Sequence, residues 1–141
     1  MSPAPDTPED NGRIPAFTLT ELLLALAIVG ILVYLALPDY SRVVANAKAT
    51  EAKLQLEHLY SLEKTHFYVH SKYSPDLREV GFEQQRLSTE GGNANYRIEV
   101  ADAAAGSFTV RATAVVDFDQ DGAFNLWEMD EQKKLKEVTP D

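Results

Sequence analysis

A short acidic stretch near the C-terminus carries the residue types best suited to binding a metal ion. Residues 117–128 read DFDQDGAFNLWE, which matches the pattern D-x-D-x-D-G-x5-E of calcium-binding loops. Calcium takes roughly six to eight oxygen ligands, and Gly122 permits the sharp bend that gathers them. The pattern predicts the following ligands: Asp117, Asp119, Asp121, the carbonyl of Ala123, Asn125 and Glu128. The sequence therefore predicts a structural Ca²⁺.

The surroundings of this loop leave an alternative open. A strand-like segment leads into it, so the pattern favours an isolated loop over the helix-flanked loop of an EF-hand. Three carboxylates so close in the chain repel one another unless a cation lies among them. The alternative is an acidic, solvent-exposed turn between strands. If residues 124–129 form a strand, the Glu128 side chain points away from the site.

A second unusual carboxylate, Glu21, lies at the start of an apolar run. Residues 22–37 carry no charge. As a helix, residues 17–37 extend about 32 Å at ~1.5 Å per residue. That length spans a bilayer core of ~30 Å. A carboxylate in lipid is unfavourable unless it is neutralised or paired, so such residues are usually functional. The alternative is a glutamate at the headgroup edge with no further role.

A secretory signal peptide is a competing interpretation of the apolar run. Such a peptide begins with basic residues and ends in a small-residue cleavage site. Residues 1–16 instead carry Asp6, Glu9 and Asp10 against one basic residue, Arg13. The run ends in Leu-Pro-Asp at residues 37–39, which is a poor cleavage site. The sequence therefore favours a membrane anchor over a signal peptide.

The residues at the start of the run resemble the N-terminal signal of type IV pilins and related pseudopilins. Residues 16–21 read AFTLTE, and the apolar run that follows leads to Pro38. In that family a prepilin peptidase cuts before a Phe, and the new amine is methylated. The resemblance implies a cut between Ala16 and Phe17, although the family usually has Gly before the cut. It also implies a helix that bends at Pro38, and pairing of Glu21 with a neighbour's Phe17 amine.

The resemblance implies a structural subunit of a type IV pilus-like or type II secretion filament, and not an enzyme. Its implied partners are other copies, a prepilin peptidase, an inner-membrane assembly platform and, before assembly, membrane lipid. The precursor is expected in the bacterial inner membrane with its C-terminal domain in the periplasm. The product is then a periplasmic or cell-surface filament. The alternative is a single-pass, membrane-anchored calcium-binding module that does not polymerise.

Hydrophobic periodicity predicts the elements that position these residues. Beyond Pro38, apolar residues recur at steps of three and four, which predicts one long helix over residues 17–69. Residues 17–37 form its transmembrane or filament-core half. Alternating patterns at residues 96–100 and 108–116 predict an antiparallel hairpin. For the tail, a strand at residues 124–131 is favoured over a helix within residues 126–138.

The predicted fold is therefore α+β, with a long N-terminal helix packed against a small antiparallel sheet. Residues 1–16 form a leader that is removed, and residues 70–141 form a loop followed by the sheet. The chain has no cysteine, which excludes disulfides and thiolate zinc sites. His66 and His70 share the spacing of some zinc ligands, but surface or filament contacts are favoured for them. The net charge of −9 argues against a direct nucleic-acid partner.

Overall fold

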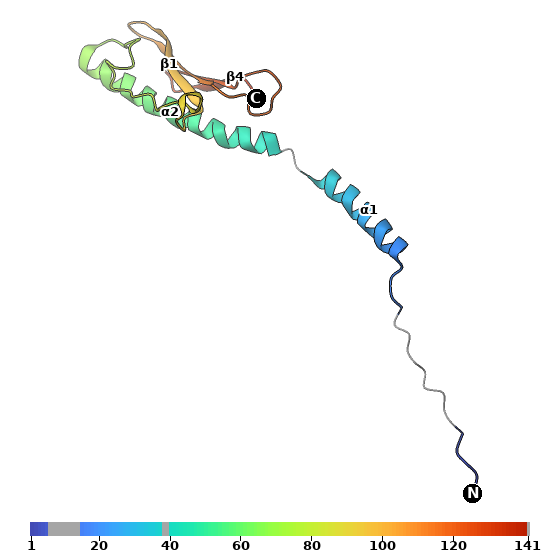
Figure 1. The fold of residues 1–141 in the computed structure, drawn as a ribbon. Coiled ribbons are helices and arrows are strands. Elements are labelled where there is room, and N and C mark those ends of the chain that lie inside the picture. Colours follow the sequence, from blue (N-terminus) through green and yellow to red (C-terminus); the bar gives the residue numbers. More distant parts are fainter. Residues whose placement is uncertain (6–14, 38–39, 141) are drawn as a thin grey trace. The chain divides into compact units, whose positions relative to one another are not determined.

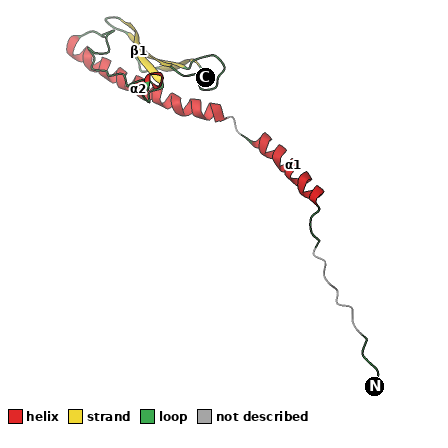
Figure 2. Cartoon of the chain, viewed as in Figure 1, coloured by secondary structure: helices red, strands yellow, loops and turns green. Residues whose placement is uncertain are grey.

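The computed structural model describes residues 1–5, 15–37 and 40–140 of this 141-residue chain. Within these residues it contains two α-helices, a short 3-10 helix and a four-stranded sheet (Figures 1 and 2). The chain divides into two compact units, Met1–Pro38 and Asp39–Asp141. The bend expected at Pro38 lies outside the described residues, as does most of the leader.

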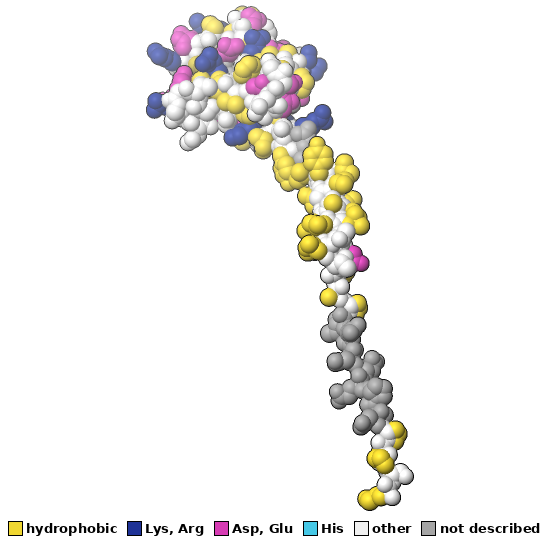
Figure 3. Space-filling model, turned by 45° about the vertical axis from the view of Figure 1, so that its right-hand side comes forward, with side chains coloured by type: hydrophobic (Ala, Val, Ile, Leu, Met, Phe, Trp, Pro, Cys, Tyr) yellow, Lys and Arg dark blue, Asp and Glu magenta, His cyan; other side chains and the backbone are white. Residues whose placement is uncertain are grey.

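Helix α1 (Leu19–Ala36) forms most of the described part of the first unit, and it is apolar all around its circumference. None of its side chains is buried, and Figure 3 shows groups of exposed hydrophobic side chains along it. The helix ends where Leu37 adopts an extended backbone with φ −64° and ψ 116°. A residue that precedes proline disfavours the α conformation, which explains the end of the helix there. The apolar helical stretch beginning at Leu19 is long and apolar enough to cross a membrane.

Helix α2 (Tyr40–His70) begins the second unit and is amphipathic, as the periodicity predicted. Its buried side chains recur at steps of three and four and form one stripe: Ala45, Ala49, Ala52, Leu56, Leu59 and Glu63. The long helix predicted over residues 17–69 is thus present as two helices, α1 and α2, with the extended Leu37 and two residues that the structure does not describe between them.

The sheet is an antiparallel meander in the order β1-β2-β3-β4. Strands β1 (Tyr96–Ala103) and β2 (Phe108–Ala114) form the predicted hairpin, with a register irregularity after Val100. The tail forms β3 (Leu126–Asp130) and β4 (Leu135–Thr139), so the favoured strand is confirmed and a fourth strand follows it.

The core lies between the buried stripe of α2 and one face of the sheet, as predicted. Alternate residues of β1 and β2 are buried against the helix, and Figure 1 shows the sheet lying along α2. The largest fully buried side chains include Tyr96, Phe108, Leu56 and Leu59. Each such side chain contributes about 1.5–3 kcal/mol relative to exposure in water. The second unit therefore has a hydrophobic core of its own.

The segment between α2 and β1 is mostly loop, as predicted, with a 3-10 helix at Ser88–Glu90 (η1). Its end is fastened to α2 by Glu51. The two carboxylate oxygens of Glu51 accept hydrogen bonds from the backbone and side-chain nitrogens of Asn95, each at 2.7 Å. These bonds fix the point at which β1 begins.

Candidate functional site

The first candidate site is the start of α1, where Thr18 and Glu21 cap the helix. The Glu21 amide donates to Thr18 Oγ1 at 3.2 Å, and the Thr18 amide donates to Glu21 Oε2 at 2.8 Å. This reciprocal pair is a capping box, which satisfies two amides that the helix itself leaves unpaired. Our interpretation of the sequence missed this role, although the T-x-x-E spacing of residues 18–21 is its known signature.

The predicted cleavage position lies directly before this cap. Ala16 and Phe17 are exposed and lie outside the helix, and the Phe17 side chain is 88% exposed. A cut between them would leave the capping box intact. It would also create an amine at Phe17, next to the residue whose amide Glu21 already binds. The local geometry is thus compatible with the processing that the resemblance implies.

The surface of α1 is unusual for a helix in water. Its large apolar side chains from Leu22 to Leu35 are 51% to 76% exposed. A Cβ atom placed on Gly30 would meet no other atom within 4 Å, so no described part of the chain covers that point. A helix that is apolar all round requires an apolar environment on every side. Lipid or neighbouring apolar helices provide such an environment.

The second candidate site is the acidic loop between β2 and β3. One oxygen from each of Asp117, Asp119 and Asp121 lies within 4.8 Å of the others. Backbone amides hold these carboxylates: Asp117 accepts from Gln120 at 2.6 Å and from Gly122 at 2.9 Å, and Asp121 accepts from Ala123 at 2.7 Å. Gly122 has φ +93°, which confirms the predicted bend. The first three predicted ligands are therefore brought together.

The last two predicted ligands are bound elsewhere. Asn125 is 3% exposed, and its Oδ1 accepts from the Tyr96 hydroxyl at 2.7 Å and from Trp127 Nε1 at 2.6 Å. Its Nδ2 donates to Glu137 Oε1 and to the Thr139 carbonyl. Asn125 thus links β1, β3 and β4, and its side-chain oxygen and nitrogen are both hydrogen-bonded within the domain.

Glu128 is also separated from the three aspartates. It lies on β3, and its Oε1 accepts from Arg111 Nε at 2.9 Å and from Nη2 at 2.6 Å. Arg111 of β2 also lies 3.6 Å from Glu99 of β1, so this ion pair spans three strands. The alternation of the strand directs Glu128 into that pair, which corrects the expectation that it closes the loop.

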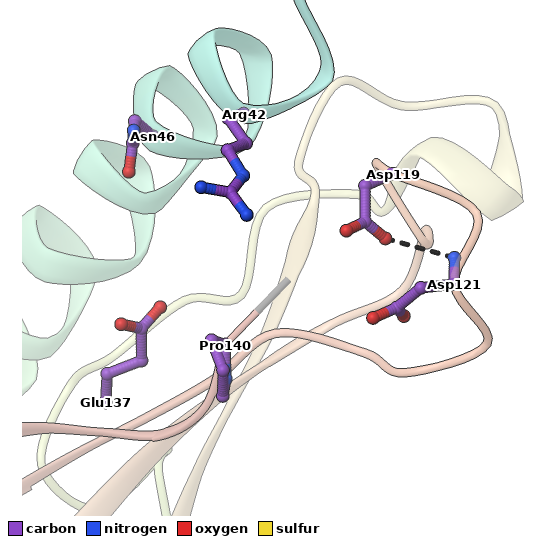
Figure 4. A pocket seen from close by; sticks show the side chains of 6 residues that line it. All are labelled: Arg42, Asn46, Asp119, Asp121, Glu137 and Pro140. Atoms are coloured by element: carbon purple, nitrogen blue, oxygen red, sulfur yellow. Dashed lines mark hydrogen bonds between the residues drawn. The ribbon is translucent and has the colours of Figure 1, made fainter. Parts of the chain in front are cut away.

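A cleft of about 470 Å³ separates the acidic loop from the first turns of α2 (Figure 4). Arg42 and Asn46 line it from α2, and Asp119 and Asp121 line it from the loop. The Arg42 side chain extends into the cleft, while the two aspartates lie across from it. Glu137 and Pro140 complete the lining. The start of α2 therefore faces the acidic loop across a charged cleft.

Comparison with known proteins agrees with the architecture. Residues 38–123 match the family described as "Type IV minor pilin ComP, DNA uptake sequence receptor". The chain belongs to the type IV pilin family, which confirms the predicted resemblance.

Individual relatives include major pilins of two bacteria. The chain is 38% identical to Type IV major pilin protein PilA of Myxococcus xanthus (strain DK1622) over 104 residues, which are 74% of this chain and 44% of that protein. It is also 38% identical over 65 residues, or 46% of this chain, to two Type IV major pilin proteins PilE1 of Neisseria gonorrhoeae. Those matches cover 39% and 36% of the relatives. The matched part therefore spans less than half the length of these relatives.

Proposed function

We propose that this chain is a structural subunit of a type IV pilus, and that it assembles with other copies through α1. The observation that carries the proposal is the helix itself, which is apolar on every face and has no buried side chain. A membrane can cover such a helix before assembly, and neighbouring copies of α1 can cover it afterwards. The same helix would also suit a type II secretion filament. The relatives found are pilins, which favours the pilus.

Processing between Ala16 and Phe17 prepares the subunit for assembly. A prepilin peptidase removes residues 1–16, the amine of Phe17 is methylated, and an inner-membrane platform adds the subunit to the filament. The exposed position of both residues before the helix cap supports this sequence of events. In the filament, Glu21 of one subunit pairs with the Phe17 amine of its neighbour. The pairing removes the penalty of two isolated charges in an apolar environment.

Mass spectrometry of the protein from its native cells tests this function. Sheared surface material and membranes are collected separately, and the N-terminus is identified in each. The expected result is a chain that begins at methylated Phe17 and is abundant in the sheared fraction. A cut form confined to membranes would favour the secretion filament. An uncut chain in both fractions would contradict the proposal and leave the non-polymerising membrane anchor.

A bound Ca²⁺ is a second part of the proposal. The clustered oxygens of Asp117, Asp119 and Asp121 support it, since such a cluster is unfavourable without a cation. The Ala123 carbonyl and water would supply further oxygens. The ion would stabilise the connection between β2 and β3 in a domain that has no disulfide.

Direct DNA binding is not part of the proposed function. The matching family is described as a DNA uptake sequence receptor, but this chain has a net charge of −9. Affinity for DNA depends mainly on neutralising phosphates with lysine and arginine. The acidic composition therefore gives no support for carrying that role over to this chain.

A further inference from the structure

The buried stripe of α2 ends in a carboxylate, Glu63, whose side chain is completely enclosed at 0% exposure. Its Oε2 accepts a hydrogen bond of 3.1 Å from the backbone amide of Ser74. Its Oε1 is also enclosed, and no donor among the described residues reaches it. An ionised carboxylate with such an oxygen is costly to bury, whereas a protonated one has a hydroxyl that can donate.

A second enclosed polar atom lies on the same face of α2, one turn further along. His66 Nε2 is buried and has no hydrogen-bond partner among the described residues. Residues three apart on a helix are neighbours on its surface, so Glu63 and His66 occupy adjacent positions. The His66 ring contacts that of His70 at an interplanar angle of 38°, with their centroids 4.3 Å apart. Two enclosed polar atoms without a partner among the described residues thus belong to neighbouring positions of the helix, but no hydrogen bond or ion pair joins them.

Ser74 connects Glu63 to the segment that follows α2. It is 1% exposed, and besides its amide bond to Glu63, its hydroxyl donates to Glu79. The same oxygen accepts from the Asp76 amide at 3.1 Å. Residues 71–82 are therefore attached to α2 by this enclosed polar point, together with the buried side chains of Tyr73, Val80 and Phe82 in the hydrophobic core.

This attachment shapes a hollow on the surface of the domain. The hollow has a volume of about 470 Å³ and lies between the segment and β1. Its lining includes Pro75, Leu77 and Arg78 from the segment and Glu99 and Val100 from β1. Any change in how Ser74 is held therefore alters the surface that the hollow presents.

The charged groups around Glu63 do not include an ion-pair partner within the described part of the chain. Within two turns of Glu63, the charged or titratable groups of α2 are Glu57, His58, Tyr60, Lys64, His66, Tyr68 and His70. Those of the segment are Lys72, Tyr73, Asp76, Arg78 and Glu79. Lys64 donates to the Tyr73 hydroxyl at 3.0 Å. The buried side chains on the inner face of the sheet are uncharged. Burial raises the pKa of Glu63 above its ordinary value, and the Ser74 amide bond only partly opposes this effect.

We propose that Glu63 and Ser74 form a proton-operated latch that fastens residues 71–82 to α2. With the proton bound, the enclosed Glu63 carboxyl is neutral, and its Oε2 keeps the hydrogen bond from the Ser74 amide. Loss of the proton to solvent leaves a buried carboxylate with an unpaired oxygen, so the segment detaches more readily. The latch operates independently of filament assembly and of calcium.

The direction of the pH effect follows from the raised pKa. A carboxyl whose pKa is higher in the fold than in the detached state stabilises the attached state while it is protonated. The latch is therefore complete below the pKa of an exposed glutamate. It weakens as the pH rises through the raised pKa of Glu63. Between the pKa of an exposed glutamate and the raised pKa of Glu63, the ratio of detached to attached chain is expected to increase about tenfold per pH unit. Above the raised pKa, Glu63 is ionised in both states and the ratio no longer changes with pH.

Hydrogen exchange of the full-length chain in detergent micelles tests the latch. Protection of residues 71–82 is measured across the pH range by mass spectrometry and corrected for the intrinsic dependence of exchange on pH. Protection of this segment is expected to fall with rising pH, while that of β2 does not. Glu63→Gln mimics the protonated carboxyl and should keep the segment protected at all pH values. The matched control is Glu57→Gln, an exposed residue on the same helix that lies 3.7 Å from Lys133, and it should behave as the native chain does.

Three results would overturn the proposal. One is the same pH-dependent loss of protection in Glu63→Gln as in the native chain. Another is a Glu63 carboxyl that titrates together with exposed glutamates in a carbon NMR measurement. The third is protection by added zinc that Glu63→Gln abolishes, because it would assign these residues to a metal site.

Discussion

Glu21 combines two roles that can be separated experimentally. In the structure its carboxylate caps α1 through the Thr18 amide. In the proposed filament the same carboxylate neutralises a neighbour's amine. Glutamine can replace glutamate in a capping box, but it carries no charge. A comparison of the two substitutions therefore distinguishes helix capping from charge pairing.

Glu21→Gln is expected to abolish filaments about as completely as Glu21→Ala, because both remove the charge. Thr18→Ala, which costs the helix only about 0.5–2 kcal/mol, should still assemble. The measurement is the yield of sheared filaments relative to the amount of chain in the membrane. Normal assembly of Glu21→Gln together with failure of Glu21→Ala would show that capping, and not charge, is what assembly needs.

Asn125 shows how a motif can mislead at the scale of one residue. The pattern predicted a calcium ligand, but the side chain makes four hydrogen bonds within the fold. Asn125→Ala would leave the Tyr96 hydroxyl and the Trp127 indole N–H without this acceptor. Buried groups that lose a partner cost about 1–3 kcal/mol each.

We therefore expect Asn125→Ala to lower the free energy of unfolding by at least ~2 kcal/mol, whether calcium is present or chelated. Asn46→Ala, at an exposed position of α2, is the matched control and should change it little. Urea unfolding followed by circular dichroism measures both. Destabilisation that is seen only with calcium present would instead identify Asn125 as a ligand.

At the scale of elements, the helices and strands that could be predicted from the sequence are those with a regular burial pattern. The alternation of β1 and β2 and the three- and four-residue steps of α2 are direct consequences of facing a single core. Strand β4 had no such signal, because Leu135–Thr139 is short, largely exposed and flanked by helix-forming residues. It forms because Lys133, at φ +63°, and Asp130, which accepts from the amides of Gln132 and Lys134, turn the chain back along β3.

The acidic loop was predictable in part for a related reason. The positions of the three aspartates and of Gly122 follow from local turn geometry, which the spacing encodes directly. The partners of Asn125 and Glu128 come from strands distant in sequence, which a local pattern does not encode. The Thr18–Glu21 cap is also encoded locally, by the T-x-x-E spacing of residues 18–21.

Chelation of calcium is expected to lower the melting temperature of residues 40–141, which contain the complete described core. A ligand at about a hundred times its dissociation constant stabilises the folded state by ~2.7 kcal/mol. Asp119→Asn should abolish the shift. Glu128→Gln should retain it, because Glu128 is bound to Arg111. Scanning calorimetry with EDTA and a magnesium control measures the effect, and an unchanged melting temperature would contradict the calcium proposal.

At the scale of the whole molecule, the chain joins two units with opposite solvent preferences. The Asp39–Asp141 unit carries its own core and a charged surface, and it needs only water around it. The Met1–Pro38 unit exposes an apolar helix that water does not solvate well. Burial of that helix among other copies would remove its apolar surface from water and leave the Asp39–Asp141 unit in contact with water. The proposed filament, like the membrane-anchored precursor, would thus give every described surface a suitable environment.

Electron cryomicroscopy of sheared filaments tests this central claim most directly. The account predicts that α1 helices pack against one another along the filament axis, with each Phe17 amine in contact with a neighbour's Glu21. It also predicts that the Asp39–Asp141 units face solvent. Filaments in which α1 makes no contact with neighbouring copies, or sheared filaments that lack this chain altogether, would contradict the account.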